Sequence, residues 1–237
     1  YRDSFYRYLN AGLKVPFSTG TDWFMYDFSR VYVPVSGQLT SRNWLEQLST
    51  GHSYITNGPF LEFTVSGQPI GGTVSLDKRG RVRIHGRAVG RSDFQRLELI
   101  HNGGIVASAA SRPVGGHHEA TIDTNFDVSR PGWFALRTPP PSVSGDPKRM
   151  RKTPLNLMGR ELFAHTSPIY ITVGGKKIFD TAVATEILAT MKEHAAAIGK
   201  NGKFLDPAAR ARVLDVHNEA IAAFEKRLAR ETRDRSR

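Results

Sequence analysis

The stretch Lys78-Arg-Gly-Arg-Val-Arg-Ile-His-Gly-Arg87 shows how the middle of this chain folds. Basic or polar side chains alternate along it with apolar or small ones: Arg81, Arg83, His85 and Arg87 against Val82, Ile84 and Gly86. Successive side chains of a β-strand point to opposite faces of the sheet. The alternation therefore predicts a strand with a basic outer face and a narrow apolar inner face.

The same period-two pattern recurs on both sides of this strand. The predicted strands cover residues 61–65, 81–89, 97–101, 105–109, 120–123, 133–137 and 169–173. Turn signals separate them, among them Asn102-Gly103-Gly104 and Gly174-Gly175. We expect short antiparallel strands that form a β-sandwich or a small barrel over residues 60–177. A basic, proline-rich loop at residues 139–154 interrupts them.

Helical spacing replaces this pattern at both ends of the chain. Residues 1–12 have the spacing of the last turns of a helix, and residues 39–51 have an apolar stripe with a cap residue before it and Gly51 after it. Apolar stripes in two C-terminal segments predict a helical hairpin over residues 178–237. The stripe must be buried against the sandwich, against further residues of the protein or against another chain. A homo-oligomer through the C-terminal helices is therefore one of the expected arrangements.

The composition excludes several classes of protein. The 237 residues contain no cysteine, which rules out a disulfide scaffold, a thiol nucleophile and any thiolate metal site. The lack of cysteine is compatible with a periplasmic or secreted location but does not fix the compartment. No run of 18 apolar residues occurs, so we expect no membrane-spanning helix.

The chain is basic, and the charge is concentrated in two segments. It has 33 Lys and Arg residues against 22 Asp and Glu residues, a formal net charge of +11. Residues 78–101 and residues 137–160 each have a net charge of +5. A basic strand beside a basic loop can hold nucleic acid or another anionic surface. Neither a nucleic-acid-binding motif nor an aromatic residue accompanies these arginines, so a solvated face with a mobile loop is the favoured interpretation, and nucleic acid is not an expected partner.

Few residues suggest chemistry. None of the eight histidines shows HxH or HExxH spacing, and neither a Gly-rich phosphate loop nor a Gly-x-Ser-x-Gly motif is present. Asp22 follows Gly20-Thr21 at the end of a short predicted strand, where a carboxylate is often presented as a metal ligand or a general base. Asp also starts turns and caps helices. Composition and spacing alone therefore assemble no complete active site.

Several segments, taken in order along the chain, carry a resemblance to a known family. They are Tyr8-Leu-Asn-Ala-Gly12, Ser18-Thr-Gly-Thr-Asp22, Arg30-Val-Tyr32, Leu39-Thr40 with Asn43-Trp-Leu45, Gly51-His-Ser-Tyr-Ile-Thr-Asn-Gly-Pro59 with Leu61-Glu-Phe63, Arg96-Leu-Glu-Leu99 with Asn102-Gly103, and Ala164-His-Thr-Ser-Pro-Ile-Tyr170. Together they resemble the C-terminal portion of polymerase-and-histidinol-phosphatase (PHP) superfamily metallohydrolases of the carbaryl-hydrolase (CehA/McbA) type. The last 60 residues match no motif of that family.

The resemblance implies an α/β fold followed by an all-β one. Residues 1–59 would be the end of a distorted (β/α)7 PHP-like barrel, residues 60–177 the β-sandwich, and residues 178–237 the helical hairpin. The family holds two or three divalent metal ions (Zn, Mn or Fe), mostly through upstream histidines and carboxylates. We therefore expect this chain to be the C-terminal part of a longer protein, with the missing N-terminal portion as its partner. The late Gly-Thr-Asp motif maps onto Asp22 as a metal ligand, whereas Phe24 stands where many members have a second histidine.

The chemistry implied is hydrolysis of an ester, a carbamate or a phosphoester in a small-molecule substrate by metal-activated water. Asp22 would hold a metal ion or orient the water. Arg30 and Tyr32 follow within ten residues and are candidates for an anion binder and a hydrogen-bond donor, or else for a surface arginine and a packed tyrosine. His165 stands before a strand and is a candidate substrate-binding residue at the interface between domains. The alternative function is a non-catalytic β-sandwich module that binds or assembles through its basic surface.

Overall fold

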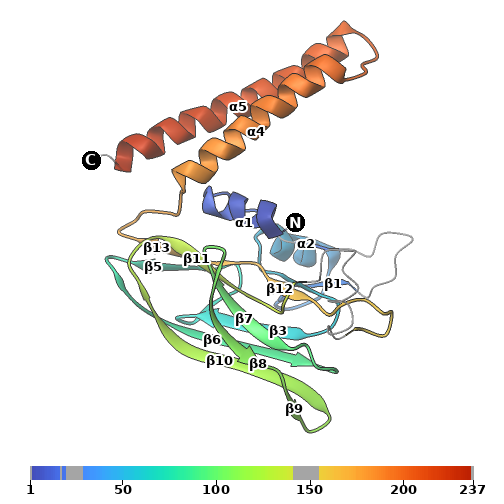
Figure 1. The fold of residues 1–237 in the computed structure, drawn as a ribbon, viewed down its shortest axis with the longest axis vertical. Helices are drawn as coiled ribbons and strands as arrows, with labels where there is room; N and C mark the ends of the chain where they lie inside the picture. The colour runs from blue at the N-terminus through green and yellow to red at the C-terminus, as the bar shows by residue number, and fades with distance from the viewer. Residues whose placement is uncertain (1, 17, 20–28, 141–154, 236–237) are drawn as a thin grey trace. The chain divides into compact units, whose positions relative to one another are not determined.

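The computed structural model describes residues 2–16, 18–19, 29–140 and 155–235, and Asp22 lies outside these ranges. The chain divides into two compact units (Figure 1). One comprises Lys14–Ile178, and the other joins Tyr1–Leu13 to Phe179–Arg237. The described part of residues 14–59 falls in the unit with the β-sheets, and the opening helix falls in the unit with the C-terminal helices, whereas the sequence predicts boundaries after residues 59 and 177.

The larger unit contains an eight-stranded sheet in which β11 (Gly132–Arg137) has neighbours on both edges. The other strands are β1 (Arg30–Tyr32), β2 (Tyr54–Thr56), β5 (Thr73–Leu76), β7 (Arg96–His101), β8 (Gly104–Ala110), β12 (Ala164–Thr166) and β13 (Ile169–Val173). Their order is β1-β2-β12-β11-β13-β5, and β7 pairs with β11 and carries β8. All the pairs are antiparallel except β5 with β13, which is parallel.

A five-stranded sheet contains the strand that the alternating arginines predict. Its order is β4-β3-β6-β10-β9, and its strands are β3 (Phe60–Val65), β4 (Gln68–Pro69), β6 (Gly80–Gly90), β9 (Arg112–Val114) and β10 (His117–Val128). In β6 the side chains of Val82 and Ile84 are fully buried, whereas Arg81 and Arg83 are exposed. The predicted alternation is therefore confirmed, and it turns the apolar side chains of β6 toward the core and the arginines toward solvent.

The two sheets enclose the main apolar core. Alternate residues of both contribute to it, including Phe63, Ile84 and Ile122 from the five-stranded sheet and Leu99, Phe134 and Leu136 from the eight-stranded sheet. Burial of these side chains is the dominant favourable contribution to folding. The arrangement is sandwich-like, with two packed sheets that are antiparallel apart from one strand pair (Figure 1).

Gly86 allows the two sheets to approach closely. A Cβ atom at this position of β6 would lie 2.5 Å from Cδ1 of Leu136 in β11. We expect Gly86→Ala to lower the free energy of unfolding by about 1–3 kcal/mol, because an added methyl group overpacks the core. Gly104→Ala is the control, since its Cβ would meet nothing nearer than a carbonyl oxygen at 3.7 Å. Urea unfolding of both variants measures the difference, and equal losses would contradict the close approach.

The described part of residues 14–59 does not form a barrel. Strands β1 and β2 pair antiparallel, and β2 continues through β12 into the eight-stranded sheet. The helix predicted over residues 39–51 is observed as α2 (Ser41–Ser49), with Thr40 as its N-cap. No closed barrel occurs among the described residues, so the barrel that the resemblance implies stays a prediction.

The smaller unit is helical. It consists of α1 (Arg2–Asn10), α4 (Thr181–Asn201) and α5 (Pro207–Arg235), and α4 with α5 forms the predicted hairpin. The α1 segment joins it because the backbone amide of Asp180 donates to the carbonyl of Asn10, and Ala11 packs in the same apolar cluster as Phe179 and Ile187. No helix in the described ranges has both the length and the hydropathy needed to cross a membrane.

Candidate functional site

Three titratable residues form a buried row across the eight-stranded sheet. Glu98 on β7 lies directly opposite Arg137 on β11, and Arg137 lies directly opposite His165 on β12. Side chains that are directly opposed on neighbouring strands point to the same face. The relative exposures of Glu98, Arg137 and His165 are only 0%, 4% and 1%. This row, called the Glu98–Arg137–His165 row below, is the most unusual polar feature of the described residues.

The row lies on the face of the sheet that points away from the sandwich core. The neighbouring positions Leu97, Leu136 and Ala164 belong to the core between the sheets. Because side chains alternate along a strand, Glu98, Arg137 and His165 must point the other way.

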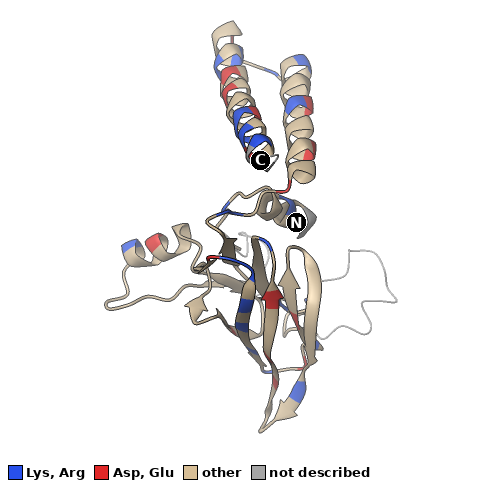
Figure 2. Ribbon diagram, turned by 90° about the vertical axis from the view of Figure 1, so that its left-hand side faces the viewer, with Lys and Arg blue, Asp and Glu red and all other residues tan. Residues whose placement is uncertain are grey.

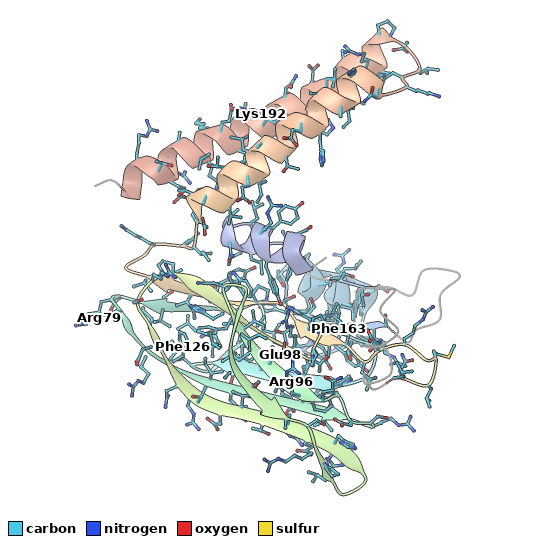
Figure 3. The ribbon with its side chains drawn as sticks, viewed as in Figure 1. Arg79, Arg96, Glu98, Phe126, Phe163 and Lys192 are labelled. Atoms are coloured by element: carbon cyan, nitrogen blue, oxygen red, sulfur yellow. The ribbon has the colours of Figure 1, made fainter. Side chains whose placement is uncertain are left out.

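Glu98 is held by two arginines. Nε of Arg137 donates to Oε2 of Glu98 at 2.9 Å, and Nε of Arg96 donates to Oε1 at 2.8 Å. Figure 3 shows Arg96 and Glu98 together within the larger unit. The Arg137 side chain is 5% exposed, whereas the Arg96 side chain is 45% exposed. A buried carboxylate is thus balanced by one buried and one half-exposed guanidinium group, as burial of a charge requires.

His165 is neutral, and its tautomer follows from its hydrogen bond. Nδ1 lies 2.7 Å from the carbonyl oxygen of Thr166, and a carbonyl only accepts, so Nδ1 carries the proton. Burial lowers the pKa of His165 to about 3, and the charge of Arg137 acts in the same direction. The lone pair is therefore on Nε2, which in this tautomer can accept a hydrogen bond or a proton.

The three residues predicted to bind substrate do not share one face. Val31, Ile55 and His165 stand in one register row, whereas Arg30 and Tyr32 occupy the alternate positions of β1. Arg30 and Tyr32 therefore point to the face opposite His165. Arg30 and Tyr32 as substrate-binding residues near Asp22, and His165 as a substrate-binding residue at an interface between domains, stay predictions. The pairing of β2 with β12 places His165 on the face of the sheet opposite to Arg30 and Tyr32.

Tyr32 belongs to an aromatic cluster at the edge of the sheet. Its ring stacks on Tyr54 with centroids 5.0 Å apart, and Phe60 meets both rings edge-on. Tyr32 and Phe60 are 41% and 46% exposed, while Tyr54 is buried. Burial raises the pKa of Tyr54, with a further contribution from Tyr32. The Tyr32 ring is thus packed on one side and exposed on another, and Arg30 is exposed on the same face of β1.

The described residues do not by themselves fit a metal centre. Asp22 lies outside them, and within the described ranges no group of three His, Asp or Glu residues could hold a metal ion. Glu98 is bound by two arginines, and the cationic Arg137 lies beside His165. Because Arg137 opposes a second cation there, the Glu98–Arg137–His165 row does not suit a metal ion.

The basic strand β6 is neutralised by its neighbours. Arg81 pairs with Asp127 at 2.9 Å, Arg83 with Asp123 at 3.4 Å, and Arg87 with both Glu119 and Glu62. Figure 2 shows blue and red segments intermixed on the sheets. Three arginines face four carboxylates, so this surface is not a basic patch. This supports the interpretation of a solvated face, while most of the basic loop at residues 139–154 lies outside the described residues.

Sequence reasoning missed the residues that form the buried row with His165. A signal for Glu98 was present, because it is a single charge inside the apolar run 97–100. Arg137 likewise ends the apolar run 133–136. A lone charge within a strand that is otherwise buried must find a partner, but the sequence does not say which.

Comparison of the chain with protein-family models, with curated proteins and with solved structures finds no match.

Proposed function

We propose that this chain is the C-terminal part of a divalent-metal-dependent hydrolase that uses metal-activated water on an ester, a carbamate or a phosphoester. The sequence motifs that follow one another along residues 1–175 support this proposal, because together they resemble PHP metallohydrolases. The structural observation that carries it is the exposed pair Arg30 and Tyr32 on β1, which begins eight residues after Asp22. An arginine beside an exposed aromatic ring suits a substrate with a negative charge or a polarised oxygen.

The proposal gives each residue a distinct role. Asp22 is the metal ligand of this chain, and further ligands come from outside the described residues. Arg30 and Tyr32 contact the substrate. His165 is only 1% exposed and does not contact the substrate. Together with Arg137 and Glu98 it supports the sheet whose edge strand is β1.

The metal content of the complete protein tests the proposal. We expect divalent metal, measured by elemental analysis after dialysis, to fall by at least one ion per chain in Asp22→Ala. Asp77→Ala, an exposed aspartate of the larger unit, is the matched control and keeps the full content. A wild-type protein without bound metal, or an Asp22→Ala variant with unchanged content, would overturn the assignment.

A binding or assembly module is the second candidate. One observation favours it, namely an apolar stripe on α5 that the described residues leave exposed. A metal-free protein that folds and self-associates would support this candidate over the hydrolase.

A further inference from the structure

Helix α5 carries two rows of side chains, each with four- and three-residue spacing. The first row faces α4, and its members are Leu214, His217, Ile221, Phe224 and Leu228. Phe224 and Leu228 pack against the buried cluster that contains Ala184 and Ile187 of α4, and Leu214 lies beside Gly199. The second row is also apolar, and its members are Ala209, Val213, Val216, Ala220 and Ala223. A repeat of this spacing keeps a row on one face of a helix, so α5 has two apolar faces where a single hairpin needs one.

The second row is open along most of its length. Val216 and Val213 are 67% and 39% exposed, and Ala220 and Ala223 are exposed as well. The next position in the row is Arg227, where Gly12 and Phe179 of the same chain contact the side chain. Nη2 of Arg227 donates to the carbonyl of Gly12 at 2.9 Å, and its guanidinium lies 5.1 Å from the centre of the Phe179 ring. Among the described residues, the row is thus covered at Arg227, half-buried at Ala209 and exposed from Val213 to Ala223.

We infer that the open row of α5 binds the same row of a second copy of this chain, in antiparallel orientation. A two-fold antiparallel seam places Ala209 opposite Ala220 of the second copy and Val213 opposite Val216 of the second copy, each twice. The symmetry centre falls between residues 214 and 215. The small side chains at the ends of the seam let the two helix backbones approach closely.

The charges that flank the row select this partner and this register. Arg212 and Glu219 stand one position before Val213 and Ala220. In an antiparallel seam these flanking positions face each other. The two-fold register therefore sets Arg212 opposite Glu219 of the second copy, twice per dimer. A shift of the register by one heptad in one direction places Glu219 opposite Glu219 of the second copy. A shift in the other direction places Arg212 opposite Arg212 of the second copy, and in both cases the like charges repel each other.

Sedimentation and light scattering of the full chain test the inference. We expect a dimer with twice the 26.3 kDa chain mass, which dissociates on dilution. Val216→Glu, which places two carboxylates near the symmetry centre, should give a monomer with unchanged circular dichroism. Ala222→Glu adds the same charge at an exposed position outside both rows and should leave the dimer intact. This outcome does not depend on bound metal, so it stands or falls separately from the proposed function.

A charge exchange distinguishes this seam from any other contact. Arg212→Glu or Glu219→Arg alone should raise the dimer dissociation constant by about tenfold, because each variant opposes like charges twice per dimer. The double variant Arg212→Glu with Glu219→Arg should restore it. A wild-type chain that stays monomeric at millimolar concentration would overturn the inference. So would a dimer whose dissociation constant is unchanged by Val216→Glu, or a double variant that dissociates as readily as the single variants.

Discussion

Glu98→Ala should lower the free energy of unfolding by about 3–5 kcal/mol, because it leaves the buried guanidinium of Arg137 without its carboxylate. The Arg137 side chain is only 5% exposed, and its Nε lies 2.9 Å from the carboxylate. Bulk water therefore cannot solvate the guanidinium group in place of the lost carboxylate. Urea-induced unfolding, followed by circular dichroism, measures the loss. The change in midpoint should come without a change in slope, since the surface exposed on unfolding stays the same.

Two further variants separate charge from shape in this cluster. Glu98→Gln keeps the shape and one hydrogen bond, so it should cost less than Glu98→Ala. Adding Arg137→Met to Glu98→Gln should recover part of the loss, since a buried ion pair can be replaced by apolar groups of similar volume. Arg96→Ala should cost the least, because the Arg96 side chain is 45% exposed. A loss below about 1 kcal/mol for Glu98→Ala would show that the row does not hold the sheet together.

The second large effect is acid destabilisation through His165. In the unfolded chain a histidine titrates near 6.5, whereas burial lowers the pKa of His165 to about 3 in the folded protein. Between these two values the unfolded state binds a proton that the native state does not. The stability contribution of neutral His165 is therefore complete above about pH 6.5 and is lost progressively as the pH falls toward 3, with a slope approaching about 1.4 kcal/mol per pH unit.

Urea unfolding at several pH values between 7 and 4 tests this effect. His165→Gln removes the titrating group, so its stability should fall less steeply with decreasing pH than that of the wild type. His194→Gln, at an exposed position of α4, is the matched control and should keep the wild-type slope. Carboxylates that titrate in this range affect all three proteins equally. Identical slopes for the wild type and His165→Gln would contradict a buried neutral imidazole.

The local elements could be predicted because each depends on residues that are close in sequence. The alternation around Ile84 set the strand and its inner face, Thr40 capped α2, and the apolar spacing after Pro207 set α5. The domain boundary expected after residue 59 did not depend on residues that are close in sequence. It followed from a family resemblance, whereas the two short strands β1 and β2 joined the eight-stranded sheet through hydrogen bonds to β12, which lies more than 100 residues away in the chain.

The candidate site residues stay predictions, and the structure adds only where their side chains point. Exposure of Arg30 and Tyr32 agrees with a role at the surface, but His165 points to the other face of the same sheet. A shift of one residue in the pairing of β2 with β12 would have placed all three together. Strand register depends on long-range packing, and no pattern within either segment encodes it.

By itself, the sequence determined periodicity: which side chains share a face of a strand or helix, where turns and caps fall, and which chemistries a chain without cysteine cannot perform. Tertiary structure decided which faces meet. It set Glu98 against Arg137, 39 residues later, and turned the arginines of β6 into ion pairs with carboxylates of β10. Periodicity is a property of neighbouring dihedral angles, whereas the balance of charge and burial depends on contacts between segments that only the folded chain brings together.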